Sequence, residues 1–163
     1  MTRTDYLRLL DFLRARRQLC RAVQLMTKGL PLLFVVCYSN AAVQLLLRRD
    51  DRLLRFLLVP ALALGCCMLL RRILDLPRPY EVFGFQPLIS RDKKGRSCPS
   101  NHTTSAVVIA LAFLYLSPAG GWMLIPAVLV AASRVCCGVH WPRDVLVGGA
   151  LAMATGIVGF WIF

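Results

Sequence analysis

The sequence predicts an all-α integral membrane protein, a helical bundle of about five transmembrane spans with an N-terminal amphipathic surface helix. The chain is 58% hydrophobic with a mean hydropathy of +0.63, too apolar for an ordinary soluble domain. It contains charge-free runs long enough to cross a hydrocarbon core of about 30 Å, and short charged clusters separate them. Because the 163 residues include no obvious linker, we expect one domain over residues 1–163.

Residues 4–21 predict an amphipathic helix. Tyr6, Leu9 and Leu13 recur at helical spacing, while charged residues occupy the other faces. We expect this helix to lie along a membrane surface, and the alternative is that it packs on the protein's own loops. The charges that interrupt this segment also argue against a cleavable signal peptide.

Apolar runs predict the spans. A turn segment, Ser117-Pro-Ala-Gly-Gly121, divides the third long run into a helical hairpin. Because successive spans alternate in direction, the ends of spans two and four and the starts of spans three and five share one side. The expected spans are residues 29–47, 53–70, two spans within 103–133, and 145–163.

Three polar segments lie where apolar runs meet loops on that shared side. They are Arg71-x6-Arg78-Pro79, the stretch from Cys98 to Ser105, and Ser133-Arg134-x5-His140-x3-Asp144. The first two bound the long connection over residues 71–102. Long connections that are not linkers are usually functional, so we expect an active-site loop there.

The arginines of these segments predict an anion site. Charged side chains at membrane depth are costly and normally face the bundle interior, where they serve a function. A guanidinium group matches phosphate oxygens in a bidentate manner, and three such groups would repel one another without an anion between them. The alternative for Arg71 is that it only marks the end of a span. The three candidates are Arg71, Arg78 and Arg134.

The two histidines of the chain both belong to these segments. Asp144 follows His140 by four residues around a helix start, so its carboxylate can hold one ring nitrogen and leave the other free as a nucleophile. His102 opens the third span and can act as a general acid. Metal binding by the same three side chains is the rival use, which the surrounding arginines would oppose.

Together the segments resemble the three-part signature of the type 2 phosphatidic acid phosphatase superfamily, which includes bacterial pyrophosphate-lipid phosphatases and vanadium haloperoxidases. The family pattern is Lys-x6-Arg-Pro, Pro-Ser-Gly-His and Ser-Arg-x5-His-x3-Asp. The resemblance covers roughly residues 71–150. Arg71 replaces the family's lysine, and Asn101 replaces a glycine whose backbone approaches phosphate. Asn tolerates unusual backbone angles, so we expect that contact to survive.

The resemblance implies metal-independent hydrolysis of a lipid phosphate or pyrophosphate through a phosphohistidine, with no cofactor. By analogy His140 attacks phosphorus, Asp144 holds His140, and His102 protonates the leaving oxygen. The same analogy assigns phosphate binding to five residues, Arg71, Arg78, Ser100, Asn101 and Arg134.

The expected substrate is a lipid phosphate of the phospholipid bilayer, in a bacterial cell membrane. Candidates are undecaprenyl pyrophosphate, phosphatidate and phosphatidylglycerophosphate. The net charge of +12 suits anionic head groups, whereas nucleic acid is not expected because most of the chain is needed to cross the bilayer. A basic run in the long loop fits any of these lipids, and its members are Arg91, Lys93, Lys94 and Arg96. The alternative is a non-catalytic lipid-phosphate-binding or assembly protein, which would lack a member of the His–Asp set.

The positive-inside rule places the polar segments in the cytoplasm, whereas most members of the resembled family work on the outer face. All but four of the 20 lysines and arginines lie on the side of the N-terminus, and the four exceptions are Arg48, Arg49, Arg52 and Arg55. The seven cysteines lack metal-ligand spacing, so we expect small apolar packing residues. Cys98 is the exception because it adjoins the site.

Overall fold

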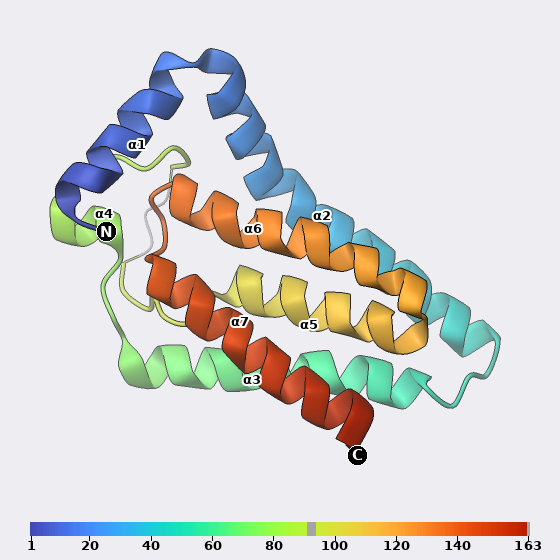
Figure 1. The fold of residues 1–163 in the computed structure, drawn as a ribbon. Coiled ribbons are helices and arrows are strands. Elements are labelled where there is room, and N and C mark those ends of the chain that lie inside the picture. The colour runs from blue at the N-terminus through green and yellow to red at the C-terminus, as the bar shows by residue number, and fades with distance from the viewer. Residues whose placement is uncertain (91–93, 163) are drawn as a thin grey trace.

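The computed structural model describes residues 1–90 and 94–162, so Arg91 and Lys93 of the basic run lie outside the described residues. Within these ranges every regular element is helical (Figure 1). In chain order the elements are α1 (Arg3–Ala15), α2 (Arg17–Leu47), α3 (Leu53–Leu74), α4 (Pro79–Phe83), α5 (Asn101–Leu116), the 3₁₀ helix η1 (Pro118–Met123), α6 (Leu124–Cys136), α7 (Pro142–Ile157) and the π-helix η2 (Val158–Ile162).

The N-terminal helix is shorter than predicted. A capping box begins α1, because the Asp5 N–H donates to Thr2 Oγ1 (3.3 Å) and the Thr2 N–H donates to Asp5 Oδ2 (2.7 Å). Arg16 leaves the helical conformation, and residues 17–21 already belong to α2. The predicted range 4–21 is therefore wrong at its C-terminal end.

The break at Arg16 lets α1 turn onto the loops at one end of the bundle, as Figure 1 shows. Its apolar residues Tyr6, Leu10 and Leu13 are buried there. Leu10 and Leu13 share an apolar cluster with Leu88 of the long loop and with other residues of that end. Packing on the protein's own loops thus occupies the apolar face, and contact of the polar face with a membrane surface stays a prediction.

Within the part of the chain that the structure describes, four helical stretches are long and apolar enough to span a membrane, namely Arg17–Leu47, Leu53–Phe83, Pro118–Cys136 and Pro142–Ile162. The predicted third span corresponds to α5, which has 16 residues and is about 24 Å long. The outer surface matches a bilayer, since Leu47 and Leu146 are 73% and 71% exposed. The prediction of an all-α membrane bundle is confirmed, with one span shorter than the rest.

The short helix α5 is the centre of the bundle. It packs against α3, α6, α7 and η1, and its residues Val108, Ala110 and Ala112 are fully buried. A helix that is apolar on all sides is buried by its neighbours. Because other helices surround α5, it has no large lipid-facing surface, and its length need not match the thickness of the bilayer.

A close contact between α5 and α7 brings two of the polar segments together. Thr104 Oγ1 donates to the backbone oxygen of Gly148 (3.1 Å). A Cβ atom at Gly148 would lie 3.0 Å from the Ser100 oxygen, so a larger residue would push the two helices apart by a few tenths of an ångström. The starts of α5 and α7 therefore meet at the end of the bundle that also holds α1, α4 and the end of α6 (Figure 1).

Candidate active site

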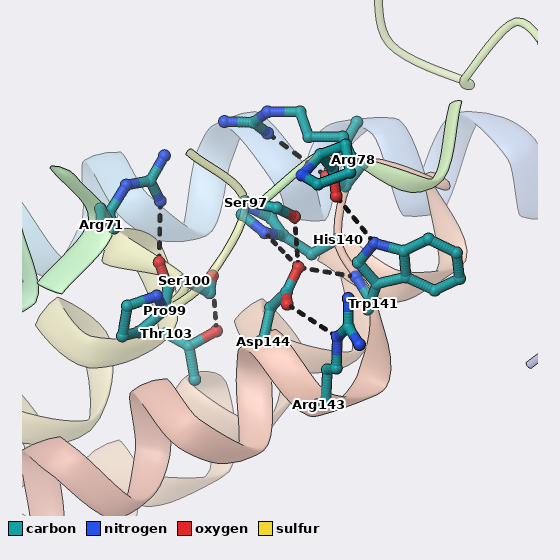
Figure 2. A network of polar contacts seen from close by, with 12 residues as sticks. Arg71, Arg78, Ser97, Pro99, Ser100, Thr103, His140, Trp141, Arg143 and Asp144 are labelled. Carbon is teal, nitrogen blue, oxygen red and sulfur yellow. Dashed lines mark hydrogen bonds and ion pairs between the residues drawn. The ribbon is translucent and has the colours of Figure 1, made fainter. Parts of the chain in front are cut away.

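The Asp144 carboxylate is the point where the polar contacts of this end converge (Figure 2). The carboxylate is fully buried in the first turn of α7. Its Oδ2 accepts hydrogen bonds from the Trp141 backbone N–H (3.0 Å) and from the Ser97 hydroxyl, and it faces His140 Nδ1 at 3.4 Å. Arg143 Nε lies 3.8 Å from Oδ1. Two separate loops therefore fix the orientation of one carboxylate.

His140 is held by both its ring and its backbone. Its backbone oxygen accepts a hydrogen bond from the Tyr6 hydroxyl (3.0 Å), and the residue is 1% exposed. Burial lowers the pKa of His140 to about 4, and the charges of Arg78 and Arg71 act in the same direction against the opposing effect of Asp144. The imidazole is therefore neutral at pH 7. With the proton on Nδ1 toward the carboxylate, Nε2 carries a free lone pair.

Arg78 joins the long loop to the segment before His140. Arg78 is 2% exposed. Its Nε donates a hydrogen bond to the Gly95 oxygen (3.2 Å), and its Nη1 donates one to the Val139 oxygen (3.3 Å). Pro79 follows as the first residue of α4, where its fixed φ suits a helix start. The guanidinium group is thus placed at the backbone of the residue next to His140.

Arg71, in the last turn of α3, reaches the second polar segment. Its Nη1 donates to the Pro99 oxygen (2.8 Å), as Figure 2 shows. Arg71, Arg78 and Asn101 line one cavity of about 700 Å³. Its remaining lining residues are mostly cationic or small, and they are Met68, Arg72, Asp75, Lys94, Gly95 and Arg96. Among the described lining residues, cations outnumber the single acidic side chain, which makes this cavity suited to an anion.

The start of α5 forms the wall between the polar segments. Ser100 is the fully buried N-cap residue, and its N–H donates to the Asp144 backbone oxygen (3.0 Å). The Thr103 hydroxyl donates to Ser100 Oγ (3.1 Å). Asn101 is the first helical residue and has no positive φ, so it needs no tolerance for unusual backbone angles. Its Oδ1 instead accepts a hydrogen bond from the Cys67 thiol (3.1 Å).

His102 and Arg134 line a different cavity, of about 380 Å³. Arg134 is 1% exposed near the end of α6, and its Nη2 donates to the Thr27 oxygen of α2 (2.9 Å). The consecutive residues Asn101 and His102 therefore face separate cavities at the same helix start. The predicted site residues all lie at one end of the bundle, with Arg71, Arg78 and Asn101 on one cavity and His102 and Arg134 on the other.

Three residues that support His140 and Asp144 were not predicted from the sequence. Ser97 directly precedes the second polar segment, Tyr6 is 134 positions from His140, and Trp141 is its neighbour. The Trp141 ring donates through Nε1 to the Pro77 oxygen (3.0 Å) and stacks edge-on against Tyr6. The position of Ser97 beside the second segment and that of Trp141 within the third offered a signal, whereas no spacing rule links Tyr6 to His140.

The cysteines, predicted to be small apolar packing residues, differ in their burial. All seven are free, and Cys67, Cys98 and Cys137 are buried whereas Cys66 is exposed. Burial raises the pKa of the Cys98 thiol to about 11, so it stays protonated at neutral pH. Among the residues that the structure describes, no group of three or more His, Cys, Asp or Glu side chains is gathered for a metal ion.

The helix ends at this site bring together a buried His–Asp pair and arginine-lined cavities. The fold and this site together define an integral membrane protein with a candidate phosphate site. The chain belongs to the PAP2 superfamily, whose family model matches residues 52–163. The resemblance inferred from the three segments is thereby confirmed. One relative, the undecaprenyl-diphosphatase BcrC of Bacillus subtilis, is 39% identical over 88 residues, which cover 53% of this chain. The match spans 44% of the length of that relative.

Solved structures show the same fold. The crystal structure of LpxE from Aquifex aeolicus superposes with a TM-score of 0.65 at 21% identity, covering 85% of this chain and 92% of LpxE. A transmembrane PAP2-type phosphatidylglycerolphosphate phosphatase from Bacillus subtilis superposes with a TM-score of 0.61 at 23% identity, covering 96% and 90% of the two chains. The membrane location predicted from the sequence is confirmed, and the three proteins named above come from bacteria.

Proposed function

We propose that this protein hydrolyses a lipid phosphate or pyrophosphate through a phosphohistidine and without a metal ion, releasing inorganic phosphate. The observation that carries the proposal is the buried His140–Asp144 pair beside the cavity lined by Arg71 and Arg78. The PAP2 family membership and the names of the relatives, an undecaprenyl-diphosphatase and a phosphatidylglycerolphosphate phosphatase, support the same reaction class.

In the first step His140 Nε2 attacks phosphorus. The Asp144 carboxylate accepts a hydrogen bond from His140 Nδ1–H. It also stabilises the positive charge that develops on the imidazole, as a carboxylate does in a catalytic triad. The lowered pKa of His140 keeps the nucleophile unprotonated at pH 7. Because the ring is almost fully buried, phosphate binding must open a path from the cavity that Arg71 and Arg78 line.

The cations of the site stabilise the charge on the phosphoryl oxygens. Arg71, Arg78 and Arg134 stay charged at every physiological pH. Ser100 and the first-turn N–H groups of α5, including that of Asn101, add helix-terminus donors that have no acceptor within the helix. Such preorganised donors act most strongly where water is excluded.

The leaving oxygen receives a proton from His102, and water then hydrolyses the phosphohistidine. No cofactor enters this scheme. A bilayer lipid is favoured as the substrate because the site lies at helix ends whose outer surfaces are apolar. Undecaprenyl pyrophosphate, phosphatidate and phosphatidylglycerophosphate remain the candidate substrates.

The test is phosphate release from a panel of these three lipids in detergent, with and without EDTA or vanadate. We expect hydrolysis that EDTA does not change and vanadate inhibits, and a loss of at least about 10³-fold in His140→Ala. Leu146→Ala, at an outward-facing position of the same helix, is the matched control. Rapid quenching with labelled substrate should trap a base-stable, acid-labile phosphoenzyme in the unsubstituted protein only.

Full activity in His140→Ala, or complete loss with EDTA, would overturn the mechanism. Binding of lipid phosphates without turnover by the purified, folded protein would instead favour the non-catalytic lipid-phosphate-binding alternative.

A further inference from the structure

The cavity that contains His102 has walls from segments far apart in the chain. Part of α2 forms one side, α5 and α6 form another, and the long loop closes it. Its lining residues are Thr27, Lys28, Pro31, Ile89, Ser90, His102 and Arg134. It is separate from the cavity lined by Arg71 and Arg78 and has a volume of about 380 Å³.

The charge of this cavity is positive. Arg134 is buried at one wall and Lys28 is exposed at another, and none of the described lining residues is acidic. Thr27 and Ser90 contribute hydroxyl groups. An alcohol or an apolar lipid tail would gain nothing from two cations, whereas an anion is attracted by both.

The position of His102 indicates which part of the substrate this cavity binds during the reaction. Under the proposed function, on which this inference rests, His102 gives its proton to the leaving oxygen. The leaving group must therefore lie on the His102 side. We propose that this cavity binds the inner phosphate of a lipid diphosphate, and that Lys28 is a specificity-determining residue that favours diphosphates over monophosphates.

Lys28 is placed where a lipid head group would lie. It directly precedes the charge-free run 29–47 of α2, so it stands at the edge of the membrane-embedded segment. It also lies outside residues 52–163, to which the family model matches, and outside the three polar segments. The residue therefore lies in α2, outside the shared signature.

The reaction balances without a further reactant. His140 Nε2 forms a bond to the terminal phosphorus, the bond from that phosphorus to the bridging oxygen breaks, and the His102 proton passes to the bridging oxygen. The lipid monophosphate leaves with its charge held by Lys28, while Arg134, which lines the same cavity, contacts the transferred phosphate. Water then attacks phosphorus, gives its proton to His102 and releases inorganic phosphate.

The test compares an isoprenyl diphosphate with the isoprenyl monophosphate that has the same tail, both in detergent. We expect the unsubstituted protein to favour the diphosphate in kcat/KM, and Lys28→Gln to lower the diphosphate-to-monophosphate ratio about 10-fold to 100-fold, the size of one lost charge-assisted contact. Lys28→Arg should restore most of the ratio. Arg17→Gln removes an exposed cation from the same helix, away from the cavity, and should leave the ratio within about 2-fold.

The outcomes separate the two proposals. Release of phosphate from neither lipid by the folded protein would refute the proposed function itself. Hydrolysis of monophosphates in preference to diphosphates would leave that function standing and refute this inference. An equal fall for both lipids in Lys28→Gln would also refute it, because Lys28 would then act on the transferred phosphate or the bilayer. Thermal unfolding in detergent checks that each variant is folded.

Discussion

The two ends of the bundle bury different kinds of side chain. At the end that holds the candidate site, the buried arginine, histidine and aspartate side chains among the described residues are Arg78, Arg134, His140 and Asp144. At the opposite end, aromatic rings stack, with Tyr38 and Phe56 centroids 4.7 Å apart, and the ion pair of Arg52 with Asp50 (2.7 Å) is partly exposed to solvent.

This difference indicates that side chains at one end serve function and side chains at the other end serve stability. Burying a charge costs free energy unless partners compensate it, so a protein that only had to fold would place its charges as the opposite end does. At the candidate site the compensation comes from loops, since Arg78 and Asp144 are bonded to segments that no helix contains. We therefore expect substitutions at the two ends to affect different measurements.

The largest expected effect is at Asp144. Asp144→Asn keeps the size of the side chain but removes the negative charge that orients His140 and stabilises its positive form. We expect kcat for phosphate release to fall about 10³-fold to 10⁴-fold, the scale of the corresponding change in a catalytic triad. Asp50→Asn at the opposite end is the control, and it should keep kcat within about 2-fold. Equal losses of kcat in the two variants would contradict the assignment of function to one end and stability to the other.

A smaller effect, on stability and not on activity, is expected at Phe56, which is fully buried between Tyr38 and Phe113. Phe56→Ala should reduce the free energy of unfolding by about 2–3 kcal/mol, less than in a soluble core because lipid is as apolar as the protein interior and only packing is lost. Denaturant titration in mixed micelles measures this. The activity per folded molecule should stay within about 2-fold, and a large loss of kcat would contradict the assignment of this end to stability.

The smallest effect tests Ser97 as a positioning residue. Because the pKa of His140 is lowered to about 4, the nucleophile should stay neutral as the pH falls from 6.5, and kcat/KM should drop only near pH 4. Ser97→Ala removes one hydrogen bond from Asp144, which then attracts the His140 proton more strongly. The pKa of His140 should rise, so the acid limb should move up by about 0.5–1 pH unit while kcat falls about 3-fold to 10-fold.

Ser97→Thr keeps the hydroxyl and should keep the acid limb near pH 4. A pH profile from 3.5 to 8 distinguishes this role from a structural one. If Ser97→Ala lowered thermal stability but left the limb in place, the serine would serve packing alone.

The class of fold and the three polar segments were predictable because they depend on neighbours in the chain. Apolar runs, proline and glycine turns, and the four-residue spacing of His140 and Asp144 are local patterns, and the alternation of spans places the segments on one side. The contact of Tyr6 with His140 and that of Ser97 with Asp144 join residues 134 and 47 positions apart. No periodicity carries such information.

The sequence by itself determined a membrane bundle of helices and a set of His, Asp and Arg side chains at one of its ends. Tertiary structure alone decided that the N-terminal helix breaks at Arg16 and packs on the loops, and that Asn101 and His102 face separate cavities. The physical reason is that hydrophobic periodicity specifies which face of a helix is buried, whereas the partner of that face depends on how all the helices pack together.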